Sequence, residues 1–503
     1  MTPESALEGS RASQVFSRAV AAVGVSVLGV RAIAVLGTLL VAAILTPKDF
    51  GYLAIVNVVV TLAQFAFGAA FTPALVHFQG AIEEVASTAF WTALGVSGLV
   101  YLVLWSVAPP LETYYGVEQL SILLRVSALS IVANSVGAVP LGLLQRRGEF
   151  KKFMLAGAGS QIACTFLTLV LALWGVGVWA LVLGLLANAV VSAILAFFYA
   201  QWAPGLGLDF KRAKPLFGFS FWVIAGGIQT WLFLYGDNAI ASRSFSAAVL
   251  GVYVVGFNLA NTLPGLVLSA VSLVAYPSLC HANRISPAGV SSRFLDIQTV
   301  TATLVVPIAC LSAALAKPVA ALVFRATWVD LGFTIGWLAI LPGACAIWSL
   351  NADGYRAIGR PDLWPKIAGV SLGLLLPCLA VAGRFGAHAF IVTRCVASLP
   401  LPLLNMAVAD RVLRIPLSAQ LARLLPAVIA GGFLWCTTSG LLLLAQPAAL
   451  AFRVLYLGSC ACAGIGVYLL VLRITGPGVW QCVLRAVGSL RSVPAAQTAF
   501  QLP

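Results

Sequence analysis

The sequence predicts an all-α integral membrane protein with about fourteen transmembrane helices, built as two parallel six-helix lobes and two further C-terminal helices. Three observations lead to this fold class. Of the 503 residues, 61% are hydrophobic and only 9% are charged, whereas soluble domains carry about 25% charged residues. Apolar runs of about twenty residues, the length that spans a bilayer, follow one another along the chain. Related segments also occur in both halves of the sequence.

The expected spans are the apolar runs between charged or Pro/Gly-rich breaks. The first lobe contains runs at 20–45, 52–77, 87–108, 119–144, 154–174 and 177–199. The second lobe contains runs at 217–242, 250–276, 298–316, 331–352, 366–383 and 386–409, and the last two spans are 421–444 and 450–473. The chain accordingly divides into an N-lobe (1–200), a cytoplasmic linker (201–216), a C-lobe (217–410), spans 13 and 14 (411–474) and a cytoplasmic tail (475–503).

The loop charges give the orientation of these spans. Cytoplasmic loops of membrane proteins are enriched in lysine and arginine. Of the 29 lysines and arginines, three lie within spans, and six lie in loops on one side of the membrane: Lys48, Arg243, Lys317, Arg325, Arg384 and Arg453. The others lie on the opposite side, so both termini are expected in the cytoplasm. The net charge of +14 therefore indicates topology and does not indicate nucleic-acid binding.

The two lobes are expected to be repeats of one another. The segment "LTPKDFGYLAIVNVVVTLAQ" begins at Leu45, and "FSAAVLGVYVVGFNLANTLPG" begins at Phe245. Gly51 aligns with Gly251, and after one inserted residue Tyr52 aligns with Tyr253. Because each repeat has an even number of spans, the repeats are parallel, with a pseudo-two-fold axis along the membrane normal. Secondary transporters of this construction bind their ligand between the two halves.

Polar stripes at helical spacing lie on the second span of each repeat. Because the spacing follows the i, i+3, i+4 and i+7 pattern, each stripe occupies one helix face. One interpretation is that the stripes hold neighbouring helices together. The other is that they line a cavity that receives a ligand, and both interpretations stay open. The stripes include Asn57, Thr61, Gln64 and Gly68 on the first repeat, and Asn258, Asn261, Thr262, Gly265, Ser269 and Ser272 on the second.

Charged residues inside the predicted spans are the strongest functional signal. Arg31 and Arg394 lie deep in their spans, and an arginine at the bilayer centre is unfavourable by about 2.5–3.5 kcal/mol. Arg125 and Asp237 lie nearer the external side. For Asp237 the structural alternative is an ion pair with Arg125 or Arg243. A cavity with more arginine than aspartate favours an anionic ligand.

Arg31 lies outside the repeated scaffold, because the residue at the equivalent position of the second repeat is Trp231. This asymmetry favours a ligand-binding role for Arg31, and a structural pair with Asp237 is the alternative. No Walker A, HExxH or GxSxG pattern is present in a suitable context. We therefore expect neither an enzyme nor a cofactor or metal site.

Several segments resemble, in order, those of Wzx-type flippases for lipid-linked oligosaccharides, a family within the multidrug/oligosaccharidyl-lipid/polysaccharide exporter superfamily. "LTPKDFG" is similar to the signature between the first two spans of that family. "YGDNAIASRSFSAAVLGVYVVGFNLA", "VAYPSL" and "GYRAIGRPDLW" resemble later family positions. Asp237 fits the aspartate that precedes the turn between spans 7 and 8.

The resemblance implies a substrate, an undecaprenyl-pyrophosphate-linked oligosaccharide that moves from the cytoplasmic to the periplasmic leaflet of the bacterial inner membrane for lipopolysaccharide or exopolysaccharide biosynthesis. It also implies membrane lipid, a polysaccharide polymerase and other export proteins as partners, and no nucleic acid. A multidrug or cation antiporter and a peptidoglycan-precursor flippase of the same superfamily are the rivals. A polymerase or ligase of the same pathway ranks behind them, because the external loops are short.

Overall fold

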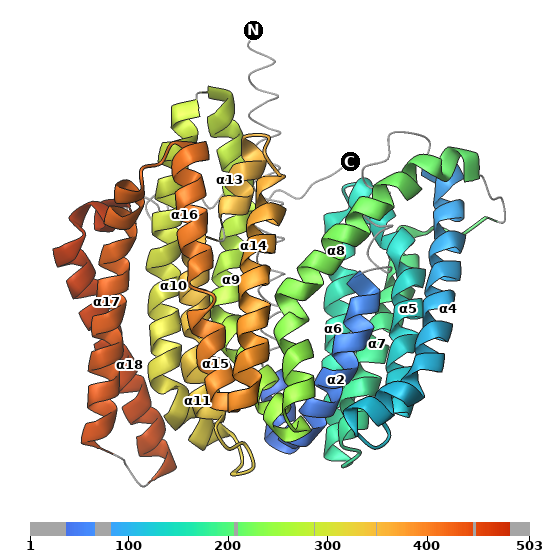
Figure 1. Cartoon of the computed structure of the whole chain (residues 1–503), viewed down its shortest axis with the longest axis horizontal. Helices are drawn as coiled ribbons and strands as arrows, with labels where there is room; N and C mark the ends of the chain where they lie inside the picture. The colour runs from blue at the N-terminus through green and yellow to red at the C-terminus, as the bar shows by residue number, and fades with distance from the viewer. Residues whose placement is uncertain are drawn as a thin grey trace, which may run out of the picture. The chain divides into compact units, whose positions relative to one another are not determined.

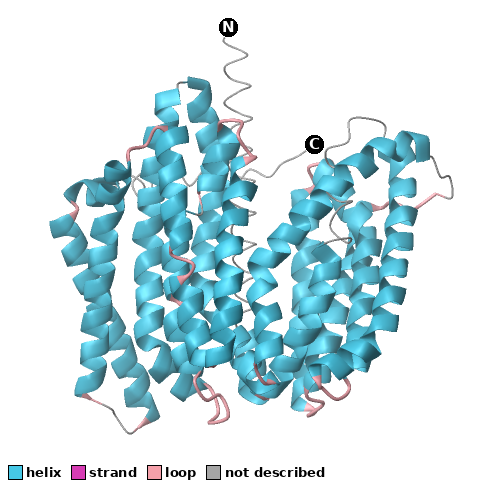
Figure 2. Ribbon diagram, in the orientation of Figure 1, coloured by secondary structure: helices cyan, strands magenta, loops and turns pink. Residues whose placement is uncertain are grey.

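All regular secondary structure in the described part of this computed structural model is helical (Figure 2). The described residues are 37–65, 82–205, 210–285, 287–348, 350–445 and 449–482. The helices of the first half are α2 (Pro47–Ala63), α4 (Ile82–Tyr115), α5 (Leu120–Arg146), α6 (Phe150–Leu173) and α7 (Val178–Ala200) (Figure 1). The long helices α8 (Phe210–Ser244), α9 (Ala247–Ile285) and α10 (Pro287–Val323) follow. The remainder are α11 (Leu331–Leu338), α12 (Ile340–Trp348), α13 (Asn351–Ala357), α14 (Leu363–Ala382), the 3-10 helix η2 (Gly383–Phe385), α15 (Ala387–Val396), α16 (Pro400–Leu413), α17 (Leu417–Leu444) and α18 (Leu450–Thr475).

The helices are those of a membrane protein, which confirms the predicted fold class. Within the described residues, ten helices are long and apolar enough to cross a bilayer. Large apolar side chains on them face outward, among them Leu99, Phe166, Phe198 and Leu455. Such surfaces would be unfavourable in water and are expected in lipid. The predicted span 20–45 is described only from residue 37, and 52–77 only to residue 65.

Two predicted spans are interrupted. The run at 331–352 forms α11, α12 and the start of α13, with a turn at Ala339. Pro342 has no backbone N–H, so it cannot donate to the carbonyl of Leu338 one turn earlier. The run at 386–409 is divided at residues 397–399, and Pro400 begins α16. Periodicity alone did not predict these breaks, although proline in the sequence marks both.

Two other predicted boundaries shift. Helix α8 begins at Phe210, so the second part of the expected linker at 201–216 is helical. Helix α10 continues to Val323, which shortens the expected external loop at 317–330. Helix α8 extends into a basic flank that contains Lys211, Arg212 and Lys214, whereas α10 continues past Lys317 through a further apolar stretch to Val323.

The chain divides into two compact units. Unit 1 holds Met1–Leu259, Val319–Thr334 and Ala368–Ala397, and unit 2 holds Ala260–Pro318, Ile335–Ile367 and Ser398–Pro503. Four boundaries fall inside α9, α10, α11 and α14, the fifth falls between α15 and α16, and none falls at the predicted linker. The assignment of the N-lobe, the C-lobe and the two C-terminal spans stays a prediction.

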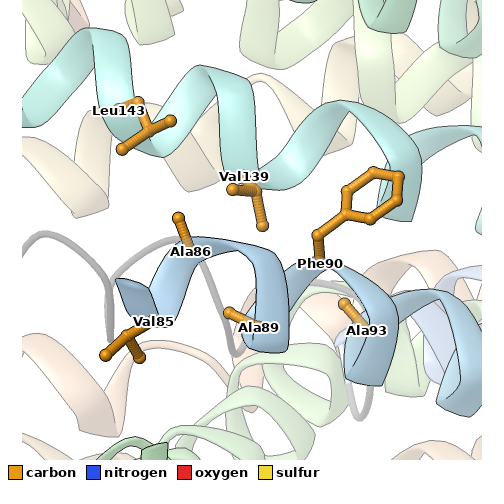
Figure 3. Packing of buried hydrophobic residues seen from close by; sticks show 7 residues of the cluster. All are labelled: Val85, Ala86, Ala89, Phe90, Ala93, Val139 and Leu143. Atoms are coloured by element: carbon orange, nitrogen blue, oxygen red, sulfur yellow. The ribbon is translucent and has the colours of Figure 1, made fainter. Parts of the chain in front are cut away.

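The core of unit 1 depends on small residues between helices. In a buried cluster, Ala86, Ala89 and Ala93 of α4 face α5. Figure 3 shows Phe90 beside these alanines, with Val139 and Leu143 on the opposite helix. Alanines let two helix backbones approach, and close packing drives helix association in lipid. Helices α4, α5, α6 and α7 therefore form a close-packed group.

The core of unit 2 includes the last two helices. Helices α17 and α18 pack on one another, with Leu434 and Tyr468 in the buried cluster between them. The Tyr468 hydroxyl also donates to the Thr303 carbonyl of α10 at 2.9 Å. Helix α18 is thereby joined to α10 by a buried polar contact.

Candidate functional site

A buried ion pair inside unit 1 is the most distinctive polar feature of the described chain. Asp237 lies on α8, Tyr253 on α9 and Arg394 on α15. The Arg394 Nε donates to Asp237 Oδ2 at 2.9 Å, and the Tyr253 hydroxyl donates to the same oxygen at 2.7 Å. Asp237 and Arg394 are only 4% and 7% exposed. One carboxylate thus joins two consecutive helices, α8 and α9, to Arg394 of α15, which lies 157 positions further along the chain from Asp237.

Aromatic rings surround this ion pair. The Phe390 ring packs edge-on against Tyr253 with centroids 5.5 Å apart, and against Phe245 at 5.3 Å. The Arg394 guanidinium lies 5.9 Å from the Phe257 ring centroid. Water is excluded from these contacts, so the attraction between the charges is stronger than in solvent. Removing one partner would leave the other charge buried and unpaired.

The partner of Asp237 differs from two of the predicted candidates, Arg125 and Arg243, and the third, Arg31, lies outside the described residues. Arg125 and Arg243 each contact an aromatic ring. Arg125 lies 4.3 Å from the Trp105 ring centroid, and its Nε donates to the Trp105 carbonyl at 3.4 Å. Arg243 lies 5.1 Å from the Tyr114 ring centroid. Arginine on aromatic rings near a helix end is typical of the membrane–water interface.

The pairing with Asp237 accounts for the buried charge of Arg394 without a ligand. A substrate contact by Arg394 or Asp237 stays a prediction. Arg31, the other deep arginine of the sequence, lies outside the described residues.

The polar stripe on α2 bonds to neighbouring helices. The Trp231 Nε1 of α8 donates to the Thr61 hydroxyl at 3.0 Å. The Thr61 hydroxyl itself donates to the Asn57 carbonyl one turn earlier. The Gln64 side chain donates to the Ser130 hydroxyl of α5 at 3.3 Å. These contacts favour helix–helix bonding for Thr61 and Gln64, while Asn57 is half-buried on the same helix.

The stripe of the second repeat lies on α9. Asn258 is exposed in the part of α9 that belongs to unit 1. Asn261 is half-buried in the part that belongs to unit 2. Their predicted role in lining a cavity is not tested by these positions.

The segment "LTPKDFG" begins α2 through a capping box. The Thr46 side chain accepts from the Asp49 backbone N–H, and Asp49 Oδ2 accepts from the Thr46 backbone N–H at 2.9 Å. Pro47 occupies the first helical position, where its missing N–H has no helix partner to lose. Phe50 and Gly51, which follow Asp49, are both buried. The family-like segment therefore specifies where α2 starts and what it packs against.

Unit 2 carries a buried network without charge. The Asn351 side chain of α13 donates to the Asn405 carbonyl of α16 at 3.0 Å and to the Tyr355 hydroxyl at 3.2 Å. The Gln420 side chain donates to the Met406 and Ile415 carbonyls at 3.1 and 2.9 Å. These amides join α13, α16 and α17 through backbone acceptors.

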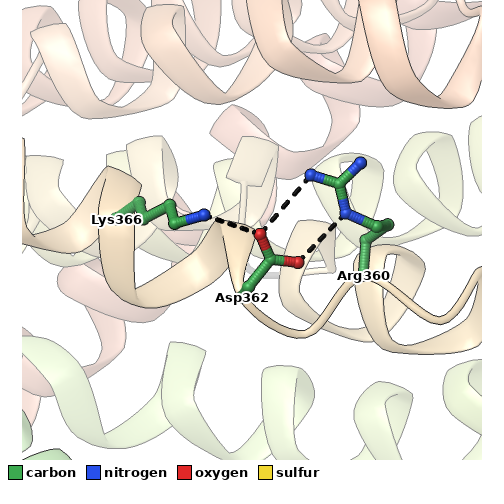
Figure 4. A network of polar contacts seen from close by, with 3 residues as sticks. All are labelled: Arg360, Asp362 and Lys366. Atoms are coloured by element: carbon green, nitrogen blue, oxygen red, sulfur yellow. Dashed lines mark hydrogen bonds and ion pairs between the residues drawn. The ribbon is translucent and has the colours of Figure 1, made fainter.

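An exposed ion cluster follows α13. Asp362 accepts from the Arg360 Nε at 3.0 Å and pairs with the Lys366 Nζ at 2.8 Å (Figure 4). Hydrogen bonds from Arg360, and then from Lys366, hold the pKa of Asp362 well below its ordinary value of 3.8. All three side chains contact solvent, so this cluster organises the loop of "GRPDLW" and is not a closed site.

Sequence reasoning missed Tyr253 and Trp231 as members of polar contacts. Tyr253 could have been found, because it aligns with Tyr52 in the repeat and follows the repeated glycine. Trp231 has no comparable signal. Within the described residues, no group of three or more His, Cys, Asp or Glu side chains could hold a metal ion.

Residues 40–332 match the family model described as "Polysaccharide biosynthesis protein". The succinoglycan biosynthesis transport protein ExoT of Rhizobium meliloti is 28% identical over 64% of this chain and 65% of its own length. The teichuronic acid biosynthesis protein TuaB of Bacillus subtilis is 23% identical over 60% of this chain and 62% of its own length. The lipopolysaccharide biosynthesis protein WzxC of Escherichia coli is 22% identical over 47% of this chain and 49% of its own length. The chain thus matches less than two thirds of each relative.

Solved structures share the fold at low identity. The lipid II flippase MurJ in an inward closed conformation has a TM-score of 0.72 and 13% identity, covering 90% of this chain and 98% of its own. An inward-facing multidrug resistance transporter of the MATE family has a TM-score of 0.62 and 12% identity, covering 76% and 94%.

Proposed function

The chain belongs to the polysaccharide biosynthesis protein family, and we propose that it is a flippase for undecaprenyl-pyrophosphate-linked oligosaccharide repeat units in lipopolysaccharide or exopolysaccharide biosynthesis. The observation that carries this proposal is the family match over residues 40–332. The names of the relatives assign them to the biosynthesis of succinoglycan, teichuronic acid and lipopolysaccharide. ExoT is named a transport protein, which supports a transport role in polysaccharide biosynthesis for this chain.

The chemistry of this substrate fits the predicted site residues. Its diphosphate is anionic and must cross about 30 Å of hydrocarbon. Arginine binds phosphate oxygens through paired N–H donors, so Arg31, Arg125 and Arg394 are the proposed contacts. Among them Arg31 is the first candidate, because Arg394 is engaged by Asp237. The polar residues of α2 and α9 are proposed partners for the sugars, and the polyprenyl tail would remain in lipid.

The topology belongs to the same proposal. We infer that the protein lies in the bacterial inner membrane with both termini in the cytoplasm, because most loop cations lie on that side. Alternating movement of the two repeats would then expose the site to each leaflet in turn. Membrane lipid, a polymerase and other export proteins are the proposed partners.

Two rival functions share this fold. A multidrug or cation antiporter needs carboxylates that bind cations or protons, and the one deep carboxylate in the described spans, Asp237, already holds Arg394. A peptidoglycan-precursor flippase would also use a cationic cavity. The family match favours a polysaccharide precursor over both.

The test is a deletion strain whose lipid-linked oligosaccharides are extracted and identified. The proposal predicts loss of one surface polysaccharide and accumulation of its undecaprenyl-pyrophosphate-linked repeat unit inside the cell. Re-expression of the chain should reverse both effects. An unchanged polysaccharide with accumulation of a peptidoglycan precursor, or with new drug sensitivity alone, would contradict the proposal.

A further inference from the structure

The starts of α2 and α9 meet through equivalent positions of the two repeats. Gly51 and Gly251 align in the repeat, and at the same offset Pro47 corresponds to Ala247. A Cβ atom on Gly51 would lie 1.7 Å from the Ala247 carbonyl oxygen. A Cβ atom on Gly251 would lie 1.8 Å from the Pro47 carbonyl oxygen and 2.9 Å from the Gly51 nitrogen. The contact is therefore reciprocal, as a local two-fold relation requires.

Only glycine permits this crossing. Real Cβ atoms essentially never approach another heavy atom within 3.0 Å, so any other residue would force the helices apart by about 1 Å or more. Both glycines are buried, and Gly51 lies in the first turns of α2, directly after the capping box. At this crossing the backbone of one helix lies directly against the backbone of the other.

Further contacts hold the start of α2 in place. The Arg325 side chain donates to the Ile44 carbonyl at 3.3 Å. The Trp328 ring packs edge-on against Phe50, with centroids 5.5 Å apart. Both come from the loop that follows α10, on the side with few loop cations in the predicted topology. These contacts all lie within unit 1.

We propose that the crossing at Gly51 and Gly251 is the external closure of the transport path and that it parts to release the glycan; this inference rests on the proposed function. Helices α2 and α9 carry equivalent segments of the two repeats, and alternating access moves one repeat against the other. A contact between bare backbones can separate and re-form without side chains changing rotamer. The two repeats thus meet at the outer side through these glycines and through the contacts of Arg325 and Trp328 with the start of α2, which must also part when the crossing opens.

Cysteine accessibility tests this closure. Val255 is one turn beyond Gly251 on the same helix face, and it is 1% exposed. Val255→Cys is labelled in intact cells with a membrane-impermeant maleimide, and the labelling of the native cysteines is subtracted. Adding Gly51→Ala or Gly251→Ala should raise the labelling several-fold, because the added methyl keeps the crossing apart. The matched control is Gly98→Ala on α4, where a Cβ meets nothing within 4 Å.

Equal labelling of the glycine variants and the Gly98→Ala control would overturn the proposal and make the crossing a fixed packing contact. A second reporter, Ala89→Cys in the α4–α5 core, must stay unlabelled, since labelling there signals unfolding. If both alanine variants unfold, the labelling rate of the Val255→Cys variant with intact glycines tests the closure instead. Labelling should then be faster in cells that assemble the glycan than in cells where its assembly is blocked, and equal rates overturn the closure. A labelling gain in a protein whose deletion leaves all polysaccharides unchanged would instead contradict only the proposed function.

Discussion

The buried pair of Asp237 and Arg394 and the exposed cluster around Asp362 use the same chemistry in opposite surroundings. In the buried pair, one carboxylate is matched to one guanidinium and one tyrosine hydroxyl, and side chains exclude water. In the exposed cluster, one carboxylate pairs with two cationic side chains, and all three groups contact solvent (Figure 4). Exposed pairs contribute little stability because water and salt screen them. A buried pair costs much more to break, because the remaining charge has no solvent.

The comparison also separates structure from function. The exposed cluster orders a loop, whereas the buried pair joins α8, α9 and α15 within unit 1. Arg31 would be a third case, because we propose that the substrate diphosphate neutralises this intramembrane charge. Substitutions at four sites, taken from the largest expected effect to the smallest, can break or sharpen this distinction.

Arg31→Ala has the largest expected effect on function. If the substrate diphosphate compensates this charge, export of the surface polysaccharide should be lost while the protein still inserts at the normal level. Arg384→Ala, which removes an exposed arginine, is the control and should leave export unchanged. Normal export by the Arg31→Ala variant would remove Arg31 from the mechanism.

Breaking the buried pair has the largest expected effect on stability. Asp237→Leu or Arg394→Leu alone should destabilise the purified protein by about 3–5 kcal/mol, because one charge remains buried. The double variant should be more stable than either single variant, since no charge is left. Thermal unfolding of the four proteins in detergent gives the coupling directly. Additive losses would show that the two side chains do not depend on one another.

The double variant also separates the two roles of the pair. If Arg394 contacts the substrate, the double variant should fold and fail to export. If the pair only joins helices, export should return together with stability.

Tyr253→Phe should have an intermediate effect. It removes one hydrogen bond to a charged carboxylate while keeping the ring against Phe390, with an expected loss of about 1.5–3 kcal/mol. Tyr52→Phe is the matched control in the first repeat, where the tyrosine lies beside the exposed Lys48. The same thermal measurement should show a clearly smaller shift for the control. Equal shifts in melting temperature would mean that the buried hydrogen bond to Asp237 contributes no more stability than the exposed contact of Tyr52.

Asp362→Asn should have the smallest effect. The pKa of Asp362 is lowered in the folded protein, so its contribution is present above its ordinary pKa of 3.8 and is lost as the pH falls toward the lower folded value. The melting temperatures of variant and wild type should therefore differ by a small, constant amount near neutral pH and converge in acid. High salt should also reduce the difference. If the difference in melting temperature persists in acid, the effect of the substitution comes from loop packing and not from charge.

Much of the fold could be predicted from the sequence, because lipid imposes length and composition on each helix. The order of the helices follows the predicted apolar runs, and the alignment of Gly51 with Gly251 anticipated two positions that touch. The interruptions at Pro342 and Pro400 were not predicted, because hydropathy is continuous across them.

The candidate site was less predictable. Asp237 and Arg394 were identified as intramembrane charges, but their pairing joins residues 157 positions apart, which no helical period encodes. The predicted pairing of Asp237 with Arg125 or Arg243 was wrong, because a position near the external side does not determine which side chains meet. In the structure these two arginines contact aromatic rings instead.

The most direct test of the proposed flippase is transport by the purified protein in lipid vesicles. Undecaprenyl-pyrophosphate-linked repeat units are placed in the vesicle membrane, and their accessibility to an external glycan-cleaving enzyme is followed. The account predicts that the wild-type protein makes the inner-leaflet fraction accessible, and that Arg31→Ala protein inserted at the same level does not. An inner-leaflet fraction that stays protected with wild-type protein present would contradict the account.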